Sequence, residues 1–268
     1  MGNEYWNKRG LLSYTYKGEK FYTITPLPYY LKRREQLLKK IDEVIKQIYH
    51  RNIHNFRIAD FGSGDGYYCC WLAKRYPEFS IYGFDITKSM VDKAKKKADS
   101  SNISNVRFFC KDMVQNENGK FDLLLILTVF QHFMDENIVK QKISQLYKVT
   151  AKNSRIILFE ATAKKTTREN KLIMRPEHFY IKTFQNNHFK LSEKEYMSFP
   201  FFCMYQKVFL KTIKKILPGT KTEKSIWINK NKFFKRLNQI VFSAGCFMDR
   251  FIGEGKEGYT LFVFKKIS

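Results

Sequence analysis

A carboxylate and three glycines stand close together in the first third of this 268-residue chain. Asp60 ends a short apolar run, and Gly62, Gly64 and Gly66 follow it at alternate positions before a helical pattern begins. Glycine lets the backbone approach a ligand closely, because a Cβ atom would block that approach. The free N–H groups at the start of the following helix attract a ligand. This stretch therefore indicates a site for a nucleotide-like cofactor.

Two further acids follow short apolar runs later in the chain. Asp85 ends one such run, and Asp112 lies just past the next. An acid at the position of Asp85 suits a ribose, because one carboxylate accepts hydrogen bonds from two neighbouring hydroxyls. A fourth apolar run begins at Phe121 and leads through residues 128–132 into a helix. These segments extend the predicted cofactor site over the ends of several strands.

The glycine spacing departs from the dinucleotide-binding pattern, in which the third glycine comes three places after the second. That place is Tyr67 here, whereas Gly66 comes two places after Gly64. An acid two residues before a G-x-G-x-G stretch, followed by acids at the ends of the next two strands, resembles the class I S-adenosylmethionine-dependent methyltransferases. The resemblance covers four segments in order between residues 56 and 132. It implies S-adenosylmethionine as the methyl donor and S-adenosylhomocysteine as the product.

The resemblance also implies a role for each acid. Asp60 is expected to face the methionine amino end of the donor, and Asp85 is expected to hold the ribose hydroxyls. Asp112 and Met113 are expected beside the adenine. The residues expected around the cofactor, of which the last two line the sulfonium region, are Asp60, Gly62, Ser63, Gly64, Gly66, Asp85, Ile86, Asp112, Met113, Thr128 and Phe130.

Transfer of the methyl group is an in-line displacement, so positioning and the removal of bulk water supply much of the rate. An oxygen acceptor of high pKa also needs a base within hydrogen-bond reach. His132, a short step beyond the fourth strand, is the expected catalytic residue; a role in shaping the pocket is the alternative. No H-x-E or C-x-x-C spacing indicates a metal site, so no metal is expected. The acceptor is expected to contact Tyr29, Tyr30, Glu160, Arg168, Arg175 and His178.

Strands alternate with helices along most of the chain. This alternation predicts an α/β fold of the Rossmann-like, doubly wound kind, with right-handed crossovers and a mostly parallel sheet of seven strands. Ligands gather at the carboxyl ends of such strands. The last strand is expected to be antiparallel. The strands are expected near residues 56–60, 80–85, 105–110, 121–128, 154–160, 190–199 and 258–264.

Local signals mark the ends of the helices. Asp135 is expected to cap the helix that follows the fourth strand. His188 stands at a turn where a left-handed backbone is expected, which histidine tolerates better than most residues. Residues 161–176 are expected to form a polar loop beside the acceptor. The expected helices of the sheet region cover residues 30–50, 67–76, 87–98, 135–149 and 177–186.

Three regions are expected along the chain. Residues 1–50 form an N-terminal aromatic lid and a helix, and Pro26 and Pro28 break the structure within the lid. The alternative for the lid is aromatic packing against the sheet edge. Residues 51–199 and 258–268 form the cofactor-binding core. Residues 200–257 form a helical cap insertion, with amphipathic helices expected at 207–217 and 230–247.

The chain carries a formal net charge of +24, from 49 Lys and Arg against 25 Asp and Glu. A polyanionic partner is one interpretation. The other is a compositional bias, which the excess of Lys over Arg favours. Five cysteines without a C-x-x-C pair indicate reduced thiols and a cytoplasmic location. No apolar run is long enough for a membrane span, although peripheral membrane contact is left open, as is the oligomeric state.

The residues after the fourth strand read Thr128-Val129-Phe130-Gln131. They lack the proline-containing sequence with which exocyclic-amino methyltransferases of nucleic acids grip a flipped base. We therefore expect O-methylation of a small, anionic metabolite or saccharide precursor, either nucleotide-linked or phosphorylated. One alternative is an RNA methyltransferase with a basic binding face. Another is a protein that binds S-adenosylmethionine without transferring its methyl group.

Overall fold

The structure is a computed structural model, and it describes residues 14–16, 19–21, 27–49, 55–112, 120–169, 172–197, 231, 233, 236, 237, 240 and 258–267. Met113 and the expected helix 207–217 lie outside the described residues, as does most of the expected helix 230–247. Most of the expected lid lies outside them as well, including the side chain of Tyr29.

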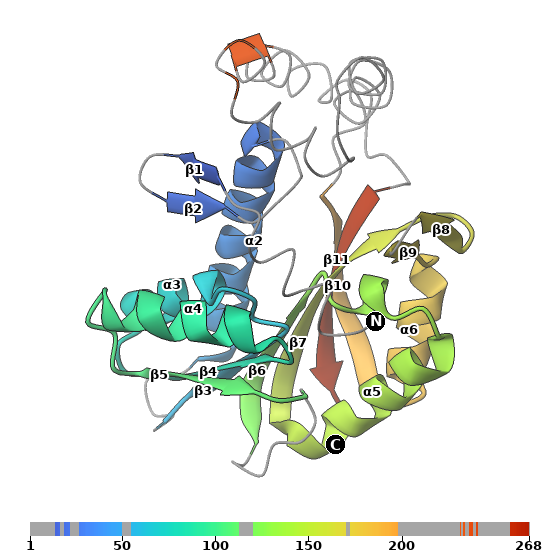
Figure 1. Ribbon diagram of the computed structural model, residues 1–268. Helices are drawn as coiled ribbons and strands as arrows, with labels where there is room; N and C mark the ends of the chain where they lie inside the picture. Colours follow the sequence, from blue (N-terminus) through green and yellow to red (C-terminus); the bar gives the residue numbers. More distant parts are fainter. Residues whose placement is uncertain are drawn as a thin grey trace. The chain divides into compact units, whose positions relative to one another are not determined.

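A seven-stranded sheet in the order β10-β11-β7-β6-β3-β4-β5 carries the fold (Figure 1). Strands β3 to β7 run parallel to one another. The expected doubly wound, seven-stranded sheet is therefore confirmed. Its strands are β3 (Arg57–Phe61), β4 (Ser80–Asp85), β5 (Val106–Cys110), β6 (Phe121–Leu127), β7 (Thr150–Thr162), β10 (Phe189–Tyr196) and β11 (Gly258–Lys266).

Strand β11 runs opposite to β10. The N–H of Ile267 donates to the carbonyl of His188 (2.8 Å), and the Ser192 hydroxyl donates to the carbonyl of Val263 (2.9 Å). The residue number increases along β10 while the number of the paired residue on β11 decreases, which is the pattern of an antiparallel pair. The antiparallel last strand is thus confirmed. His188 adopts a φ of 62°, as expected for this turn.

The strand register brings the expected site residues to one edge of the sheet. Phe61 pairs with Phe84 on one side and with Ile126 on the other. Asp85 pairs with Cys110, and Leu127 pairs with Phe159. The residues that follow these positions therefore leave the sheet together at its carboxyl edge, where ligands bind in parallel sheets.

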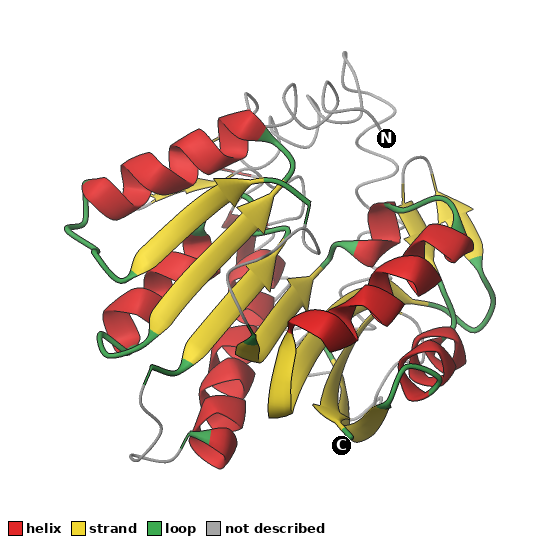
Figure 2. Cartoon of the chain, turned by 90° about the horizontal axis from the view of Figure 1, so that it is seen from below, coloured by secondary structure: helices red, strands yellow, loops and turns green. Residues whose placement is uncertain are grey.

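Helices cover both faces of the sheet (Figures 1 and 2). The face toward α5 and α6 carries an aromatic core that includes Phe84, Phe121, Tyr180 and Phe184. Asp135 caps α5 as expected, because its carboxylate accepts from the N–H of Asn137. The helices are α3 (Tyr67–Arg75) and α4 (Lys88–Asp99) on one face, and α5 (Glu136–Val149) and α6 (Glu177–Gln185) on the other.

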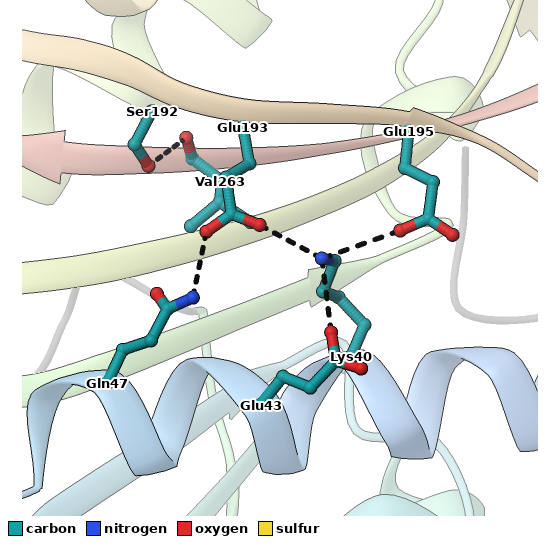
Figure 3. A network of polar contacts seen from close by, with 7 residues as sticks. All are labelled: Lys40, Glu43, Gln47, Ser192, Glu193, Glu195 and Val263. Carbon is teal, nitrogen blue, oxygen red and sulfur yellow. Dashed lines mark hydrogen bonds and ion pairs between the residues drawn. The ribbon is translucent and has the colours of Figure 1, made fainter.

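The helix before the sheet, α2 (Leu27–Ile48), begins earlier than expected. Pro28 lies in its first turn, where a missing N–H costs nothing, so the expectation that Pro28 breaks the structure was wrong. Near the other end of α2, Lys40 points at carboxylates of β10 (Figure 3). Its ammonium lies 2.9 Å from Glu193 and 3.5 Å from Glu195.

Strand β7 is longer than expected, and the expected polar loop at 161–176 contains regular structure. β7 continues to Thr162, and β8 (Thr167–Glu169) then pairs antiparallel with β9 (Leu172–Met174). The chain returns to β7 through a bridge between Thr162 and Arg175. Strands of three residues, the polar β8 and the apolar β9, are too short to show the alternation by which a strand is predicted from sequence.

The described chain divides into two compact units. The larger comprises residues 1–7, 40–195 and 259–268, and the smaller comprises residues 8–39 and 196–258. The smaller unit contains an antiparallel pair, β1 (Tyr14–Tyr16) with β2 (Glu19–Phe21). The expected division into lid, core and cap stays a prediction. No helix in the described part of the chain has the length and apolarity that a membrane crossing requires.

Candidate functional site

The glycine stretch forms a tight loop between β3 and α3. Gly62, Gly64 and Gly66 have φ angles of 80°, 55° and 74°, a conformation that side chains with a Cβ rarely adopt. A Cβ on Gly62 would lie 2.5 Å from Val129 Cγ2, whereas a Cβ on Gly64 would meet no atom of the described residues within 4 Å. Gly62 therefore serves packing within the protein, and Gly64 faces space that the described residues leave open.

Asp85 joins the loop after β3 to the loop after β4. One of its oxygens accepts from the N–H of Gly64 (2.9 Å), and the other accepts from the N–H of Thr87 (2.8 Å). Both carboxylate oxygens retain a further lone pair for a ligand. Asp85 thus lies beside the part of the glycine loop that is open.

Asp60 is buried directly behind this loop, with 2% of its surface exposed. Burial raises the pKa of Asp60 to about 7. A hydrogen bond from the Cys69 thiol (3.6 Å) opposes the shift, and the charges of Asp85 and Asp65 add to it. Asp65 already forms an ion pair with Lys97 at 2.6 Å, so the repulsion between Asp60 and Asp85 is what favours a cationic ligand here.

Asp112 is engaged elsewhere. Its carboxylate forms an ion pair with Lys142 of α5 at 2.7 Å. The structure thus brings Asp60 and Asp85 into mutual electrostatic contact and ties Asp112 to a helix on the aromatic-core side of the sheet. Asp112 keeps one carboxylate oxygen outside this ion pair, because Lys142 approaches Oδ2.

Residues 128–133 connect β6 to α5 and contain the expected base. Thr128 has a φ of 61°, which is rare for a β-branched residue and marks local strain. His132 ends the short 3-10 helix η1 (Phe130–His132) and is partly exposed, with its Nε2 atom 3.4 Å from Nε2 of Gln131. Phe130 is fully buried in the aromatic core, and its expected place beside the sulfonium stays a prediction.

Glu160 and Arg175 were expected to contact the acceptor, and both are 0% exposed. Glu160 accepts hydrogen bonds from three backbone N–H groups of the connection 128–133. Arg175 donates to the carbonyls of Phe130 and Phe133. Neither side chain exposes surface, and the expected contact of both with the acceptor stays a prediction.

The other expected residues lie at the surface or near it. Ile86 is 46% exposed after β4. Arg168 on β8 and His178 on α6 are exposed, and Tyr30 on α2 is half-buried in the smaller unit. Ser63 is 7% exposed, and its hydroxyl has no hydrogen-bond partner among the described residues.

Sequence reasoning missed the role of Val129. The packing of Val129 on Gly62 comes from two segments that are distant in sequence, so no local pattern could indicate it. In the part of the chain that the structure describes, no group of three His, Cys, Asp or Glu side chains could hold a metal ion.

The family model described as a methyltransferase domain matches residues 54–224. The chain is 37% identical over 92 residues to a malonyl-[acyl-carrier protein] O-methyltransferase of Acetivibrio thermocellus, a match that covers 34% of this chain and 31% of that protein. It is 34% identical over 82 residues to a tRNA (guanine-N(7)-)-methyltransferase of Rubrobacter xylanophilus, covering 30% of this chain and 35% of that protein. The matched stretch thus spans about a third of each relative's length.

Solved structures with the same fold include an O-methyltransferase from a trans-AT polyketide synthase multienzyme of Brevibacillus brevis, which was crystallised in complex with S-adenosyl-L-homocysteine. The TM-score is 0.62 at 18% sequence identity, and the superposition covers 91% of this chain and 78% of that one. At this identity the likeness shows the fold.

Proposed function

This chain belongs to the methyltransferase-domain family, and from that membership we propose that it transfers a methyl group from S-adenosylmethionine to an acceptor oxygen. The observation that carries the proposal is the pairing of Asp60 and Asp85 around a glycine loop at the carboxyl edge of the sheet. This edge is where parallel sheets of this kind bind their ligands.

The residues present fit such a donor. The donor carries two cationic groups, an ammonium and a sulfonium, and it also carries a ribose with two neighbouring hydroxyls. Asp60 and Asp85 supply negative charge, and Asp85 keeps lone pairs for two hydroxyls. The open space beside Gly64 admits a ligand against the backbone, and Ser63 offers a buried hydroxyl without a partner among the described residues.

The proposed roles follow from these positions. Asp60 neutralises the ammonium, and Asp85 holds the ribose. Asp112 accepts a hydrogen bond from the adenine through the oxygen that Lys142 leaves available, with Met113 beside the ring. Ile86 is exposed beside Asp85, where it can cover the adenosine. Thr128 lies at the turn that faces the reacting methyl.

The bound donor supplies an electrophilic methyl carbon. His132 takes the proton of the acceptor hydroxyl as that oxygen attacks in line, so that the acceptor reacts as an oxyanion. His132 is suited to this role because it is partly exposed at the end of η1, immediately after the buried Gln131. The acceptor side of the site is proposed to include Arg168 and His178, and the roles expected for Tyr29 and Tyr30 stay predictions.

The proposed acceptor is a small hydroxylated metabolite or saccharide precursor that carries negative charge, in a cytoplasmic setting. The segment Thr128–Gln131 supports it, because the segment lacks the prolines that grip a flipped base. Similarity to O-methyltransferases supports the reaction type. The free thiols of Cys69, Cys70 and Cys110 support a reducing compartment.

Incubation with isotope-labelled S-adenosylmethionine and a metabolite extract tests this proposal. Mass spectrometry should find the label in a small anionic product, and His132→Ala should reduce the rate without changing donor affinity. Binding of the donor without any labelled product would favour the alternative of a donor-binding protein. Absence of donor binding would contradict the proposal altogether.

An RNA acceptor is the second candidate, and two observations favour it. The chain carries a net charge of +24, and part of it resembles a tRNA methyltransferase. Contacts to phosphates release counterions, so the affinity for RNA should then fall steeply as salt rises. Label transferred to RNA, together with such a salt dependence, would replace the small-molecule acceptor.

A further inference from the structure

We propose that Glu160 and Arg175 are positioning residues that together hold the connection 128–133 against the glycine loop. The connection contains Thr128 and His132, so the proposal deepens the function proposed above and rests on it for the donor-binding readout. Neither side chain is named in any role by the family match. Both are fully buried, so they act through the backbone that they hold.

Glu160 holds the N–H groups of the connection. Its Oε1 atom accepts from Val129 (2.8 Å) and from Phe130 (2.7 Å), and its Oε2 atom accepts from Gln131 (2.9 Å). Consecutive N–H groups at the start of a helical turn attract an anion. Here the anion is a side chain from the end of the neighbouring strand β7. The three N–H donors favour the ionised form of this carboxylate, against burial, which raises the pKa of Glu160 to about 8.

Arg175 holds the carbonyl groups of the same connection. Its Nη1 atom donates to Phe130 O (2.9 Å), and its Nη2 atom donates to Phe133 O. The backbone of Arg175 is itself fixed, because it bridges to Thr162 and accepts from the N–H of Ala163 (3.3 Å). The turn is therefore held from its N–H side by a negative charge and from its carbonyl side by a positive charge.

The two charges depend on each other. Burial raises the pKa of Glu160, while the three N–H donors and the guanidinium of Arg175 act in the opposite direction. Arg175 also forms an ion pair with Glu136 (3.8 Å), so removal of either Glu160 or Arg175 leaves the other charge without part of its electrostatic compensation. Substitution of Glu160 or Arg175 alone should accordingly destabilise the fold by more than half as much as substitution of both together.

Glu160 and Arg175 act on the proposed donor site through Val129, which lies in the connection that they hold. A Cβ on Gly62 would lie 2.5 Å from Val129 Cγ2, so the connection packs directly on the glycine loop. The preceding residue, Thr128, holds a φ of 61° and donates its N–H to Phe159 O (2.7 Å). A strained residue persists only where its surroundings over-determine it. Release of the turn should therefore loosen both the strained residue and the glycine loop.

The structure offers a matched control for Arg175. Lys266 is 8% exposed and donates to the carbonyls of Tyr147 (2.8 Å) and Thr150 (2.9 Å), at the opposite end of β7. Arg175→Met and Lys266→Met each remove one buried cation that donates to two carbonyls. Their comparison separates a general loss of packing from an effect on the connection 128–133.

The test combines amide hydrogen exchange over residues 128–133 with calorimetric titration of S-adenosylhomocysteine into the full chain. Arg175→Met should accelerate exchange in these residues and weaken binding by roughly tenfold or more, as expected for one lost charge-assisted contact. Lys266→Met should lower the melting temperature and change neither quantity. Glu160→Gln keeps the shape of the side chain and should act like Arg175→Met, while Arg175→Lys should restore part of the protection.

Wild-type exchange and wild-type affinity in Glu160→Gln and Arg175→Met would overturn the proposal, as would equal effects from Lys266→Met. If Arg175→Met fails to fold, Glu160→Gln and Arg175→Lys decide the matter. If the wild-type chain does not bind S-adenosylhomocysteine, the proposed function fails, whereas the exchange measurement still tests whether the pair holds the connection.

Discussion

At the scale of single residues, each glycine of the loop after β3 has different surroundings. Gly62 and Gly66 are constrained by protein atoms, since a Cβ there would lie 2.5 Å from Val129 or 2.7 Å from Phe108. Gly64 is constrained by no atom of the described residues within 4 Å, although its φ of 55° is left-handed. In the proposed function, the neighbour of Gly64 is the donor.

Substitution of Gly64 should therefore separate stability from binding. Gly64→Ala should cost roughly 1–2 kcal/mol of stability, the price of a left-handed backbone with a Cβ. It should also abolish the binding of S-adenosylhomocysteine, because the new methyl group fills the space beside the backbone. Gly66→Ala is the comparison, and it should unfold more readily because its Cβ meets Phe108 and Ala94. Thermal melts and calorimetry check both, and unchanged affinity in Gly64→Ala would place the ligand elsewhere.

The raised pKa of Asp60 predicts a pH dependence of stability. Its pKa is about 7 in the folded protein, against an ordinary value of 3.8. The folded state therefore binds a proton that the unfolded chain has already released, so this contribution to stability is complete below pH 4 and is lost as the pH rises through 7. The slope should approach about 1.4 kcal/mol per pH unit within this window.

Denaturant titrations between pH 4 and pH 8 measure this slope. Asp60→Asn should lower the slope by about 1.4 kcal/mol per pH unit, because the amide does not titrate, and the remaining slope belongs to Glu160, whose pKa burial raises to about 8. Asp92→Asn removes a half-exposed carboxylate on α4 and serves as the control that keeps the wild-type slope. A wild-type slope in Asp60→Asn would assign the dependence to another group.

Residue types and spacing predicted that acids follow the strands and that the glycines form the tight loop after β3. They also predicted that Asp135 caps a helix and that His188 has a left-handed backbone. They did not predict that Glu160, Arg175 and Phe130 are fully buried. Glutamate and arginine are mostly exposed in proteins, and they are buried only where a partner compensates the charge. That partner is here the backbone of another segment, which no local pattern in the sequence reveals.

At the scale of elements, the parallel strands were the most predictable part. Continuous apolar runs that end in acids mark buried strands, and their alternation with helices indicates parallel pairing through right-handed crossovers. The hairpin of β8 and β9 was missed because each of its strands has only three residues, too few to show a periodic pattern. The start of α2 was placed too late, since Pro28 occupies the first turn, where proline is tolerated.

The contact between α2 and β10 yields a prediction about stability. Lys40 is 14% exposed and joins Glu43, Glu193 and Glu195, and these partners raise its pKa above the ordinary value although burial acts against them. Lys40→Met would leave the carboxylates without their shared cation. We expect a loss of about 1–3 kcal/mol in the free energy of unfolding.

Lys46→Met on the same helix is the matched control. Lys46 pairs with Asp42 one turn away and is 66% exposed, so its loss should cost no more than about 0.5 kcal/mol. Urea titrations of both variants measure the difference. Equal losses would show that the three-carboxylate network contributes no more than an ordinary surface pair.

At the scale of the whole molecule, family membership and the seven-stranded, mostly parallel sheet agree with what the sequence predicts. The acceptor is the part that the sequence resolves least, because it depends on the segments around the site, which vary independently of the sheet. The net charge of +24 belongs to this scale too. It bears on association with anions in general, and it specifies no reaction.

The central claim is that carboxylates at the ends of neighbouring strands hold the methyl donor. Calorimetric titration of S-adenosylhomocysteine into the wild-type chain, Asp85→Ala and Asp122→Ala tests it most directly. Asp122 is the matched control, because it also accepts from a backbone N–H, that of Arg57 (2.9 Å), but at the amino end of β6. We predict that Asp85→Ala weakens binding by roughly tenfold or more while Asp122→Ala binds as the wild type does. Wild-type affinity in Asp85→Ala would contradict the account.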